Sequence, residues 1–269
     1  MKRVFAYCLA LLFPLAAAAQ TGSGENFQPV PGQPGKDVVW VPTPPALVEK
    51  MLDMARVTSR DFVMDLGSGD GRNIIAAAKR GARGVGVEYN PDMVALSRRN
   101  AAKEGVAERA KFVQGDMFQA DISQATVLAL FLLPDNLRKL TPKFMEQLKP
   151  GTRLVMNGFS IPGWDPDATE TATGECGNWC TSHLYYAPAK VAGTWRLGQG
   201  MLRLEQSFQM LSGTLNGAAV SNARLKGQEI SFTVGDAKYS GRVNGNAMSG
   251  EVSGPRPGQW KATRLGHDH

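Results

Sequence analysis

Three glycines alternate in a short segment of the chain, which reads Asp65-Leu66-Gly67-Ser68-Gly69-Asp70-Gly71. The segment follows an apolar stretch and precedes an amphipathic one, so it is predicted to join a strand to a helix. Glycines in such a loop let a ligand approach the backbone closely. The carboxylates of Asp65 and Asp70 would repel a pyrophosphate. The loop is therefore predicted to bind a ligand that carries a positively charged amine and a sulfonium.

Two further acidic residues follow the next predicted strands. Glu88 stands about twenty residues after the first glycine of the loop, where an acidic side chain can accept hydrogen bonds from both hydroxyls of a ribose. Asp116 ends the third strand, where a carboxylate can accept from the exocyclic amine of adenine while the backbone around Met117 contacts the ring edge. Ligands of open α/β sheets bind at the carboxyl ends of parallel strands. The acidic residues together predict a nucleoside ligand.

Charge and motif content exclude two other classes of ligand. No Gly-Lys-Ser/Thr follows the glycine loop, which excludes a nucleoside-triphosphate P-loop. The chain has a formal charge of +6 but no run of five or more Lys and Arg residues. A dedicated nucleic-acid surface is therefore not expected.

The elements around these residues alternate between apolar runs and amphipathic helices from residue 38 to residue 188. This alternation predicts a Rossmann-like α/β domain with a doubly wound, mostly parallel sheet. Strands are expected at residues 62–66, 84–88, 111–114, 126–131, 153–156 and 183–186, and helices at residues 73–80, 91–104 and 135–148. The uniformly apolar run 126–131 is expected to be central in the sheet.

After residue 188 the rhythm changes to short strands separated by Gly and Asn. Seven candidate strands lie between residues 190 and 265, with even spacing and short turns. This pattern predicts a small antiparallel all-β accessory domain, either a barrel or a sandwich. Its opening Gly193-Thr194-Trp195 and a late Trp260 resemble calycin-type barrels. It contains no catalytic cluster.

The N-terminus has the order of a secretory signal. Lys2 and Arg3 precede an apolar run and then four alanines, which predicts a cleaved signal peptide at residues 1–19 and an exported, periplasmic protein. A Gly- and Pro-rich flexible leader is expected at residues 20–37. The apolar run is too short for a stable membrane span. Export favours a disulfide between Cys176 and Cys180, and a zinc site that includes His183 is the alternative.

The motifs together resemble class I S-adenosylmethionine-dependent methyltransferases. The run Trp40-Val41-Pro42-Thr43-Pro44, the glycine loop and the segments ending at Glu88 and Asp116 look like bacterial relatives of mitochondrial protein-lysine methyltransferases. Those enzymes modify the adenine nucleotide carrier or the c-ring protein of ATP synthase. The resemblance spans roughly residues 38–165.

The resemblance implies S-adenosyl-L-methionine as cofactor and a role for ten residues in binding it: Trp40, Thr43, Asp65, Gly67, Ser68, Gly69, Gly71, Glu88, Asp116 and Met117. Asp65 would lie near the cofactor's amine. Trp40 and Thr43 would belong to an N-terminal arm that closes over the site. The related pattern commonly has Tyr where Trp40 stands. Trp packs against a cation but supplies no phenolic proton.

The implied reaction is in-line transfer of a methyl group from the sulfonium to an amine, with a protein lysine as the expected acceptor. Phe131 would line an apolar channel for the lysine, and the candidates for a general base are Asp135, Asn157, Asp165 and His183. Two alternatives stay open: a small-molecule N- or O-methyltransferase, and an exported ligand-binding protein without catalysis. The motifs specify no oligomeric state.

Overall fold

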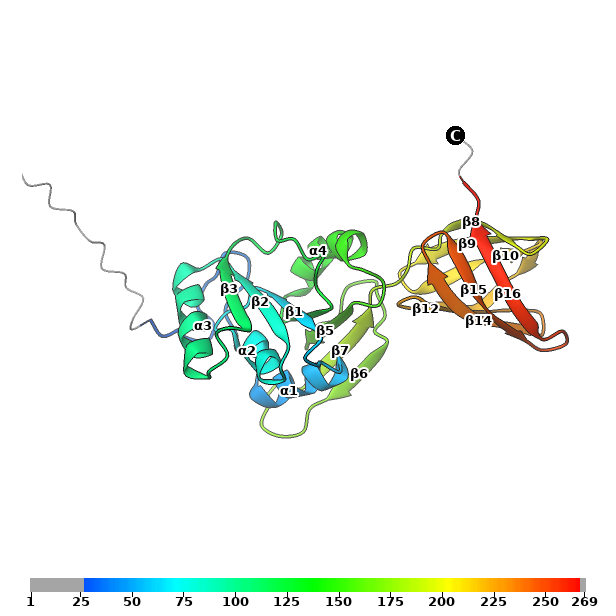
Figure 1. Ribbon diagram of the computed structural model, residues 1–269. Helices are drawn as coiled ribbons and strands as arrows, with labels where there is room; N and C mark the ends of the chain where they lie inside the picture. The colour runs from blue at the N-terminus through cyan, green and yellow to red at the C-terminus, as the bar shows by residue number, and fades with distance from the viewer. Residues whose placement is uncertain (1–26, 267–269) are drawn as a thin grey trace, which may run out of the picture.

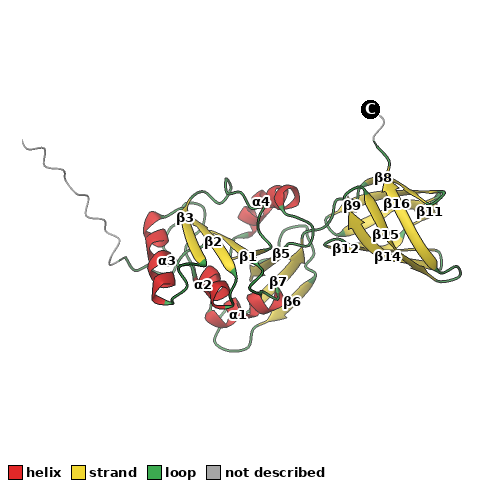
Figure 2. Cartoon of the chain, viewed as in Figure 1, coloured by secondary structure: helices red, strands yellow, loops and turns green. Residues whose placement is uncertain are grey.

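The computed structural model describes residues 27–266, which form two units, each built on its own sheet (Figure 1). The predicted signal peptide at residues 1–19 and the first part of the predicted leader lie outside the described residues. The first unit mixes helices and strands, and the second is built of strands (Figure 2). The fold class predicted from the sequence, an α/β domain followed by an antiparallel all-β domain, is confirmed.

The first unit contains a seven-stranded sheet with the order β3-β2-β1-β4-β5-β7-β6. Its strands are β1 (Phe62–Leu66), β2 (Arg83–Glu88), β3 (Ala110–Gln114), β4 (Val127–Leu130), β5 (Arg153–Asn157), β6 (Ala168–Thr171) and β7 (Thr181–Tyr186). Strands β1 to β5 pair in parallel, and β7 runs antiparallel to both β5 and β6. The carboxyl ends of β1 to β5 therefore meet at one edge, where a ligand site is expected.

Helices cover both faces of this sheet. They are α1 (Pro45–Met54), α2 (Arg72–Lys79), α3 (Pro91–Lys103) and α4 (Pro134–Gln147). Alternate residues of β1 enter separate cores: Val63 packs with side chains of α1, α2 and α3, whereas Met64 packs with side chains of α4. Two buried faces explain why β4 is apolar throughout.

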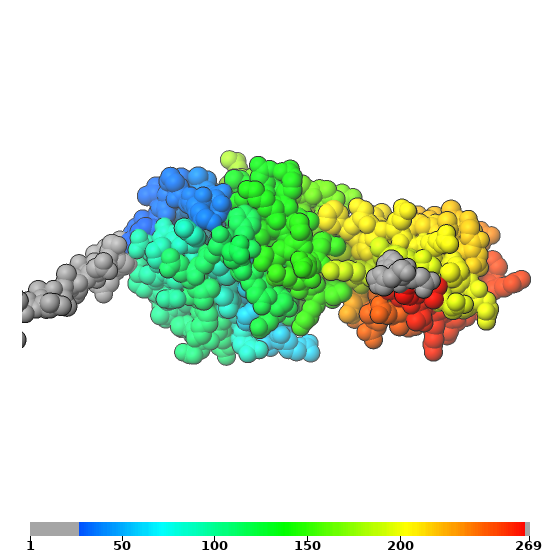
Figure 3. Space-filling view, turned by 90° about the horizontal axis from the view of Figure 1, so that it is seen from above, coloured from blue at the N-terminus to red at the C-terminus, as the bar shows by residue number. Residues whose placement is uncertain are grey.

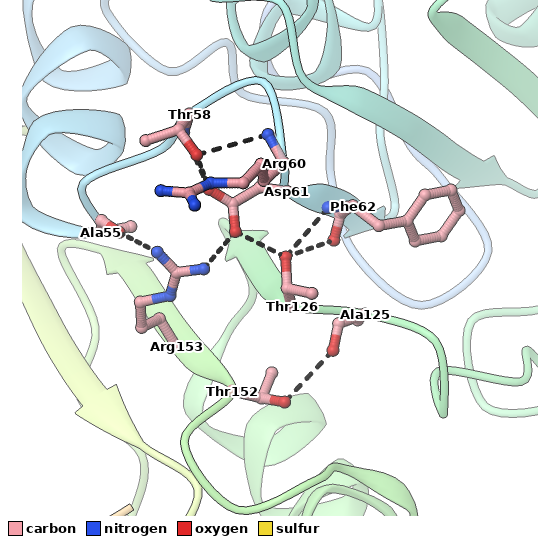
Figure 4. Close-up of polar contacts among 9 residues, drawn as sticks. All are labelled: Ala55, Thr58, Arg60, Asp61, Phe62, Ala125, Thr126, Thr152 and Arg153. Carbon is pink, nitrogen blue, oxygen red and sulfur yellow. Dashed lines mark hydrogen bonds and ion pairs between the residues drawn. The ribbon is translucent and has the colours of Figure 1, made fainter.

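Hydrogen bonds at the opposite edge of the sheet fix the starts of three strands (Figure 4). The Asp61 carboxylate accepts from the Thr126 hydroxyl (2.8 Å) and pairs with the Arg153 guanidinium, and the backbone N–H of Phe62 donates to the Thr126 Oγ1 (2.9 Å). Burial opposes ionisation of Asp61, but bonds from Thr58 and Thr126 and the charge of Arg153 hold its pKa below the usual value. The network joins β1, β4 and β5 on the side away from the glycine loop.

The second unit is a closed antiparallel barrel. Its strands are β8 (Gly193–Leu197), β9 (Gly200–Ser207), β10 (Met210–Leu215), β11 (Ala218–Ala219), β12 (Ser221–Lys226), β13 (Glu229–Val234), β14 (Ala237–Asn244), β15 (Ala247–Ser253) and β16 (Gly258–Arg264). Neighbours in the chain pair in turn, and the pairing of β16 with β8 and of β9 with β10 closes the ring. Closure leaves few unpaired sheet edges.

Large side chains fill the barrel. Trp195, Phe232 and Trp260 are buried among aliphatic residues of the surrounding strands. The Arg264 guanidinium lies 4.3 Å from the centre of the Trp195 ring, and it donates to two backbone carbonyls just before β8. The last strand is thus fastened to the first by one side chain.

The two units are in contact (Figure 3). The rings of Trp164 and Phe208 stack with centroids 5.1 Å apart, and Gln209 Nε2 donates to the Asp165 carbonyl at 2.6 Å. An ion pair joins Arg224 to the nearly buried carboxylate of Asp167 at 2.9 Å.

Helix α1 and strand β6 were not among the elements predicted from the sequence. Strand β6 has one partly buried and three exposed residues, so it lacks the alternating apolar pattern of a strand. Over residues 27–266, no helix combines the length and the apolar character needed to cross a membrane.

Candidate functional site

A cavity of about 220 Å³ lies at the carboxyl ends of β1, β2 and β4. Nine of the ten residues predicted to bind the cofactor line it: Trp40, Thr43, Asp65, Gly67, Ser68, Gly69, Glu88, Asp116 and Met117. The tenth, Gly71, lies behind the cavity as the residue preceding helix α2. With φ at +85°, a Cβ there would lie 2.6 Å from the Phe112 ring. Gly71 therefore shapes the turn and the packing beneath it, rather than the cavity wall.

The glycine loop is fastened to the neighbouring strand β2. The backbone N–H groups of Gly67 and Ser68 both donate to the carbonyl of Val87, at 2.8 and 3.1 Å. Gly69 has φ of +54°, and a Cβ at this position would lie 2.6 Å from the indole nitrogen of Trp40. Only glycine leaves room for the N-terminal arm to pack directly on the loop.

Glu88 connects the loop to the start of helix α3. One carboxylate oxygen accepts from the backbone N–H of Gly69 at 3.0 Å, and the other accepts from that of Asn90 at 2.9 Å. Asn90 in turn caps helix α3 by accepting from the N–H groups of Asp92 and Met93. A carboxylate has four lone-pair positions, so Glu88 retains acceptors for a ligand in the cavity.

Asp65 is a buried carboxyl group at the end of strand β1. Burial raises its pKa to about 8, and the nearby Glu88 and Asp70 act in the same direction against the hydrogen bond from Asn73 at 3.0 Å. A cation placed beside Asp65 would reverse this shift, because it stabilises the ionised form. The arrangement suits a positively charged ligand group.

A segment of the N-terminal region covers the adenine end of the predicted site. Lys36 Nζ bonds to Asp116 Oδ2 at 2.7 Å and lies 5.0 Å from the centre of the Tyr89 ring. The pair raises the pKa of Lys36 and lowers that of Asp116. Hydrogen bonds between Gly32, Gln33 and Trp40 close the segment into a hairpin-like turn. Residues 33–43 therefore form one wall of the cavity.

Thr43 is held from two sides. Its hydroxyl accepts from Asn157 Nδ2 at 3.1 Å, and its carbonyl accepts from Arg72 Nη1 at 2.6 Å. Arg72 also pairs with Asp70 at 2.6 Å. The second carboxylate of the glycine loop is thereby neutralised by the start of helix α2, and the N-terminal arm is fixed to that helix.

Three aromatic side chains form the remaining wall. Phe131, Phe159 and Trp179 line the cavity, and Trp179 lies 5.0 Å from Phe131 and 5.4 Å from Phe159 between ring centroids. Phe131 follows β4, as predicted. Phe159 and Trp179 were missed, because they lie in loops that show no periodicity. The position of Trp179 within the Cys176–Cys180 pair was the available signal.

The four candidates for a general base do not line the cavity. Asp135 is exposed and pairs with Arg138, and His183 Nδ1 is 2.9 Å from the Thr169 hydroxyl. Asp165 faces the barrel through its carbonyl. Asn157 reaches the site only through Thr43.

Cys176 and Cys180 form a disulfide, which agrees with the expectation from export rather than with the zinc alternative. In the part of the chain that the structure describes, no group of three or more His, Cys, Asp and Glu side chains is placed to hold a metal ion.

Comparison with known proteins decides the family. The description "ANTKMT methyltransferase domain" matches residues 65–168. A protein-lysine N-methyltransferase from Saccharolobus islandicus is 47% identical over 131 residues, which are 48% of this chain and 81% of the relative. The chain belongs to the class I S-adenosylmethionine-dependent methyltransferases. S-adenosylmethionine is its cofactor.

Two other relatives extend this comparison. A lysine N-methyltransferase from Homo sapiens, named for its action on an ATP synthase protein, is 38% identical over 128 residues, and this methyltransferase spans 54% of that protein's length. The solved structure of an RNA methyltransferase from Salinibacter ruber, in complex with S-adenosyl-L-homocysteine, is 46% identical with a TM-score of 0.53. The match covers 56% of this chain and 96% of that chain.

The cavity of the methyltransferase has the donors and acceptors that this cofactor needs. Asp65, Glu88 and Asp116 supply acceptors along its length. The Ser68 hydroxyl is buried in the wall without a hydrogen-bond partner among the described residues, and such a group is stabilised by a polar ligand. The residues present therefore fit the cofactor.

Proposed function

We propose that this enzyme methylates the side-chain amine of lysine in a protein. The arrangement that carries the proposal is the aromatic wall of Phe131, Phe159 and Trp179 on the same cavity as Asp65 and the glycine loop. An aromatic wall suits the alkyl stem and the amine of lysine. The names of the Saccharolobus and human relatives, both lysine N-methyltransferases, support the same acceptor.

The roles of the chain's own residues follow from their positions. S-adenosylmethionine supplies an electrophilic methyl group on a positively charged sulfur. Asp65 is assigned to its amine, Glu88 to its ribose and Asp116 to its adenine. The glycine loop and Trp40 hold the binding cavity closed on one side. Most of the acceleration comes from positioning, because the methyl group is already activated.

The acceptor amine must lose a proton before it reacts, since the reference pKa of lysine is about 10.4. Phe131, Phe159 and Trp179 exclude water from the place where the amine enters. Desolvation lowers the pKa of an amine and so favours the reactive, neutral form. Thr43 has a hydroxyl at the edge of the cavity that can orient the amine, and Asn157 fixes that hydroxyl.

Transfer of a labelled methyl group tests the acceptor class. Purified residues 20–269 would be incubated with methyl-labelled S-adenosylmethionine and, in separate reactions, with protein, RNA and small-molecule fractions of cell extracts. We expect label in protein, at lysine, as identified by mass spectrometry. A Glu88→Ala variant is the control for transfer without the enzyme site. Label confined to RNA or to small molecules, or no transfer at all, would refute the proposal.

We also propose that residues 1–19 direct export to the periplasm and are removed. The Cys176–Cys180 disulfide supports this, because disulfides persist in oxidising compartments. Fractionation of cells that express the full chain tests it. A shortened protein in the periplasmic fraction is expected, and full-length protein confined to the cytoplasm would contradict export.

A further inference from the structure

The aromatic wall draws its three members from separate segments. Phe131 follows β4, Phe159 follows β5, and Trp179 comes from the connection between β6 and β7. All three side chains are half-buried in this structure. Trp179 makes the closest contact in the group, because a Cβ on Gly158 would lie 2.9 Å from its ring. A larger residue at position 158 would push the indole away from its present position.

The connection that carries Trp179 is closed by a covalent ring. Cys176 and Cys180 form a disulfide, and Trp179 lies within the five residues that it closes. The Trp179 backbone N–H donates to the Cys176 carbonyl at 2.9 Å, and the Ala172 N–H donates to the Cys180 carbonyl at 2.7 Å. Residues 173–175 and 177–178 are exposed and contribute no core packing. The disulfide therefore supplies much of the restraint on a short, exposed loop.

We propose that the Cys176–Cys180 disulfide positions Trp179 as a specificity-determining wall of the acceptor site, so that the redox state of the loop sets the affinity for the acceptor. This inference rests on the proposed methylation of an amine. The indole face would contact the alkylammonium group of the acceptor on entry. The cofactor contacts at Asp65, Glu88 and Asp116 do not involve this loop.

The redox step is a thiol–disulfide exchange with a dithiol. A thiolate of the dithiol attacks one sulfur of the Cys176–Cys180 bond, and the mixed disulfide then resolves through the second thiol. The protein gains two electrons and two protons to give two cysteine thiols, and the dithiol is oxidised to its disulfide. The freed loop no longer holds Trp179 against Gly158.

Two binding measurements on the full mature chain test the inference. The first is the Kd of S-adenosylhomocysteine by calorimetry, which reports the cofactor site. The second is the Kd of n-butyltrimethylammonium, a mimic of a methylated lysine side chain, for the protein saturated with S-adenosylhomocysteine. The proteins are the unchanged chain, Trp179→Ala, Trp179→Phe and the double variant Cys176→Ser/Cys180→Ser. Trp260→Phe, within the barrel, is the matched control for loss of an indole.

We expect Trp179→Ala to weaken binding of the ammonium probe at least tenfold, Trp179→Phe to weaken it less, and Trp260→Phe to leave it unchanged. The Kd of S-adenosylhomocysteine should stay within about twofold throughout. Dithiothreitol should weaken probe binding by the unchanged chain, with reduction verified by thiol titration, and should not affect the double Ser variant. The unchanged chain needs no substitution, so this arm does not depend on how a variant folds.

Three results would overturn the inference: no binding of the probe to the unchanged chain, equal probe affinity in Trp179→Ala, or equal affinity before and after verified reduction. Parallel losses of both ligands in Trp179→Ala would also overturn it, because they would mean a structural role. Failure of the unchanged chain to bind S-adenosylhomocysteine is a separate outcome. It would refute the cofactor site on which the proposed function depends.

Discussion

Glu88 links three parts of the site through one carboxylate, since it bonds to the glycine loop and to the turn before α3 while facing the cavity. Hydrogen bonds to a charged group are each worth about 1.5–3 kcal/mol. Glu88→Ala is therefore expected to raise the Kd of S-adenosylmethionine about 10- to 100-fold. Calorimetric titration measures this. Glu108→Ala, which removes a glutamate whose side chain is 97% exposed, is the matched control and should bind normally. Unchanged affinity in Glu88→Ala would mean that the site is misassigned.

Asp65 makes cofactor binding depend on pH. Its pKa of about 8 lies above the usual value of 3.8, so the folded protein without ligand holds a proton there at pH 6–7.5. Binding of a cationic amine beside Asp65 favours the carboxylate and releases that proton. Affinity should therefore rise as the pH increases from 6 to 7.5, by up to about tenfold per pH unit. Asp65→Asn should flatten this dependence, and a slope that survives in the variant would exclude Asp65 as its source.

The same shift affects stability in the absence of ligand. Between about pH 4 and pH 8 the unfolded chain has lost the Asp65 proton while the folded chain retains it. The folded state binds more protons, so the contribution of Asp65 to the free energy of unfolding falls as the pH rises through this window. Thermal unfolding of the protein and of Asp65→Asn across this range measures the difference.

Residues that follow strands were predictable, and residues in irregular segments were not. Asp65, Glu88 and Asp116 stand at strand ends, where the fold class alone places them on one edge. Lys36, Phe159 and Trp179 reach the cavity from segments without a repeating pattern. Their positions depend on long-range contacts, such as the pair between Lys36 and Asp116, that no local sequence signal encodes.

At the scale of elements, the turn into helix α2 depends on Gly71. An alanine there would adopt φ near +85°, which costs about 1–2 kcal/mol, and its Cβ would meet the Phe112 ring at 2.6 Å. Overpacking adds about 1–3 kcal/mol. Gly105→Ala is the matched control, since Gly105 has φ of +69° but no atom within 4 Å of the added Cβ. Urea denaturation should show a larger loss of stability in Gly71→Ala, and equal losses would contradict the packing role.

Most strands of both sheets were predictable because their residues alternate or form short apolar runs between turns. The predicted run 62–66 coincides with β1, and the run 229–234 coincides with β13. Strand β6 was missed because its stability comes from pairing with β7 rather than from buried side chains. Closure of the barrel was also beyond the local pattern. It depends on the pairing of β16 with β8, which are far apart in sequence.

At the scale of the whole molecule, Arg224 joins the barrel to the catalytic unit. It pairs with Asp167, whose pKa is raised by burial although Arg224 opposes the shift. Arg224→Ala would leave a buried carboxylate without its partner. We expect a loss of about 1–3 kcal/mol at pH 7, below the range for fully buried pairs because Arg224 is half-exposed.

The pH dependence of this loss identifies its cause. The ion pair exists only while Asp167 is ionised, so the stability difference between the protein and Arg224→Ala should shrink as the pH falls toward 4. Urea denaturation at several pH values measures it. Arg203→Ala, an exposed arginine of the same barrel, should show little loss at any pH. A gap that is constant with pH would indicate lost packing of the Arg224 stem instead.

The central claim is that the cavity between the glycine loop and residues 33–43 holds the cofactor. A crystal structure with S-adenosylhomocysteine tests it most directly. The account predicts density for the ligand in this cavity, with its ribose beside Glu88 and its adenine beside Asp116. Ligand density elsewhere, including inside the barrel, with this cavity filled only by water, would contradict it.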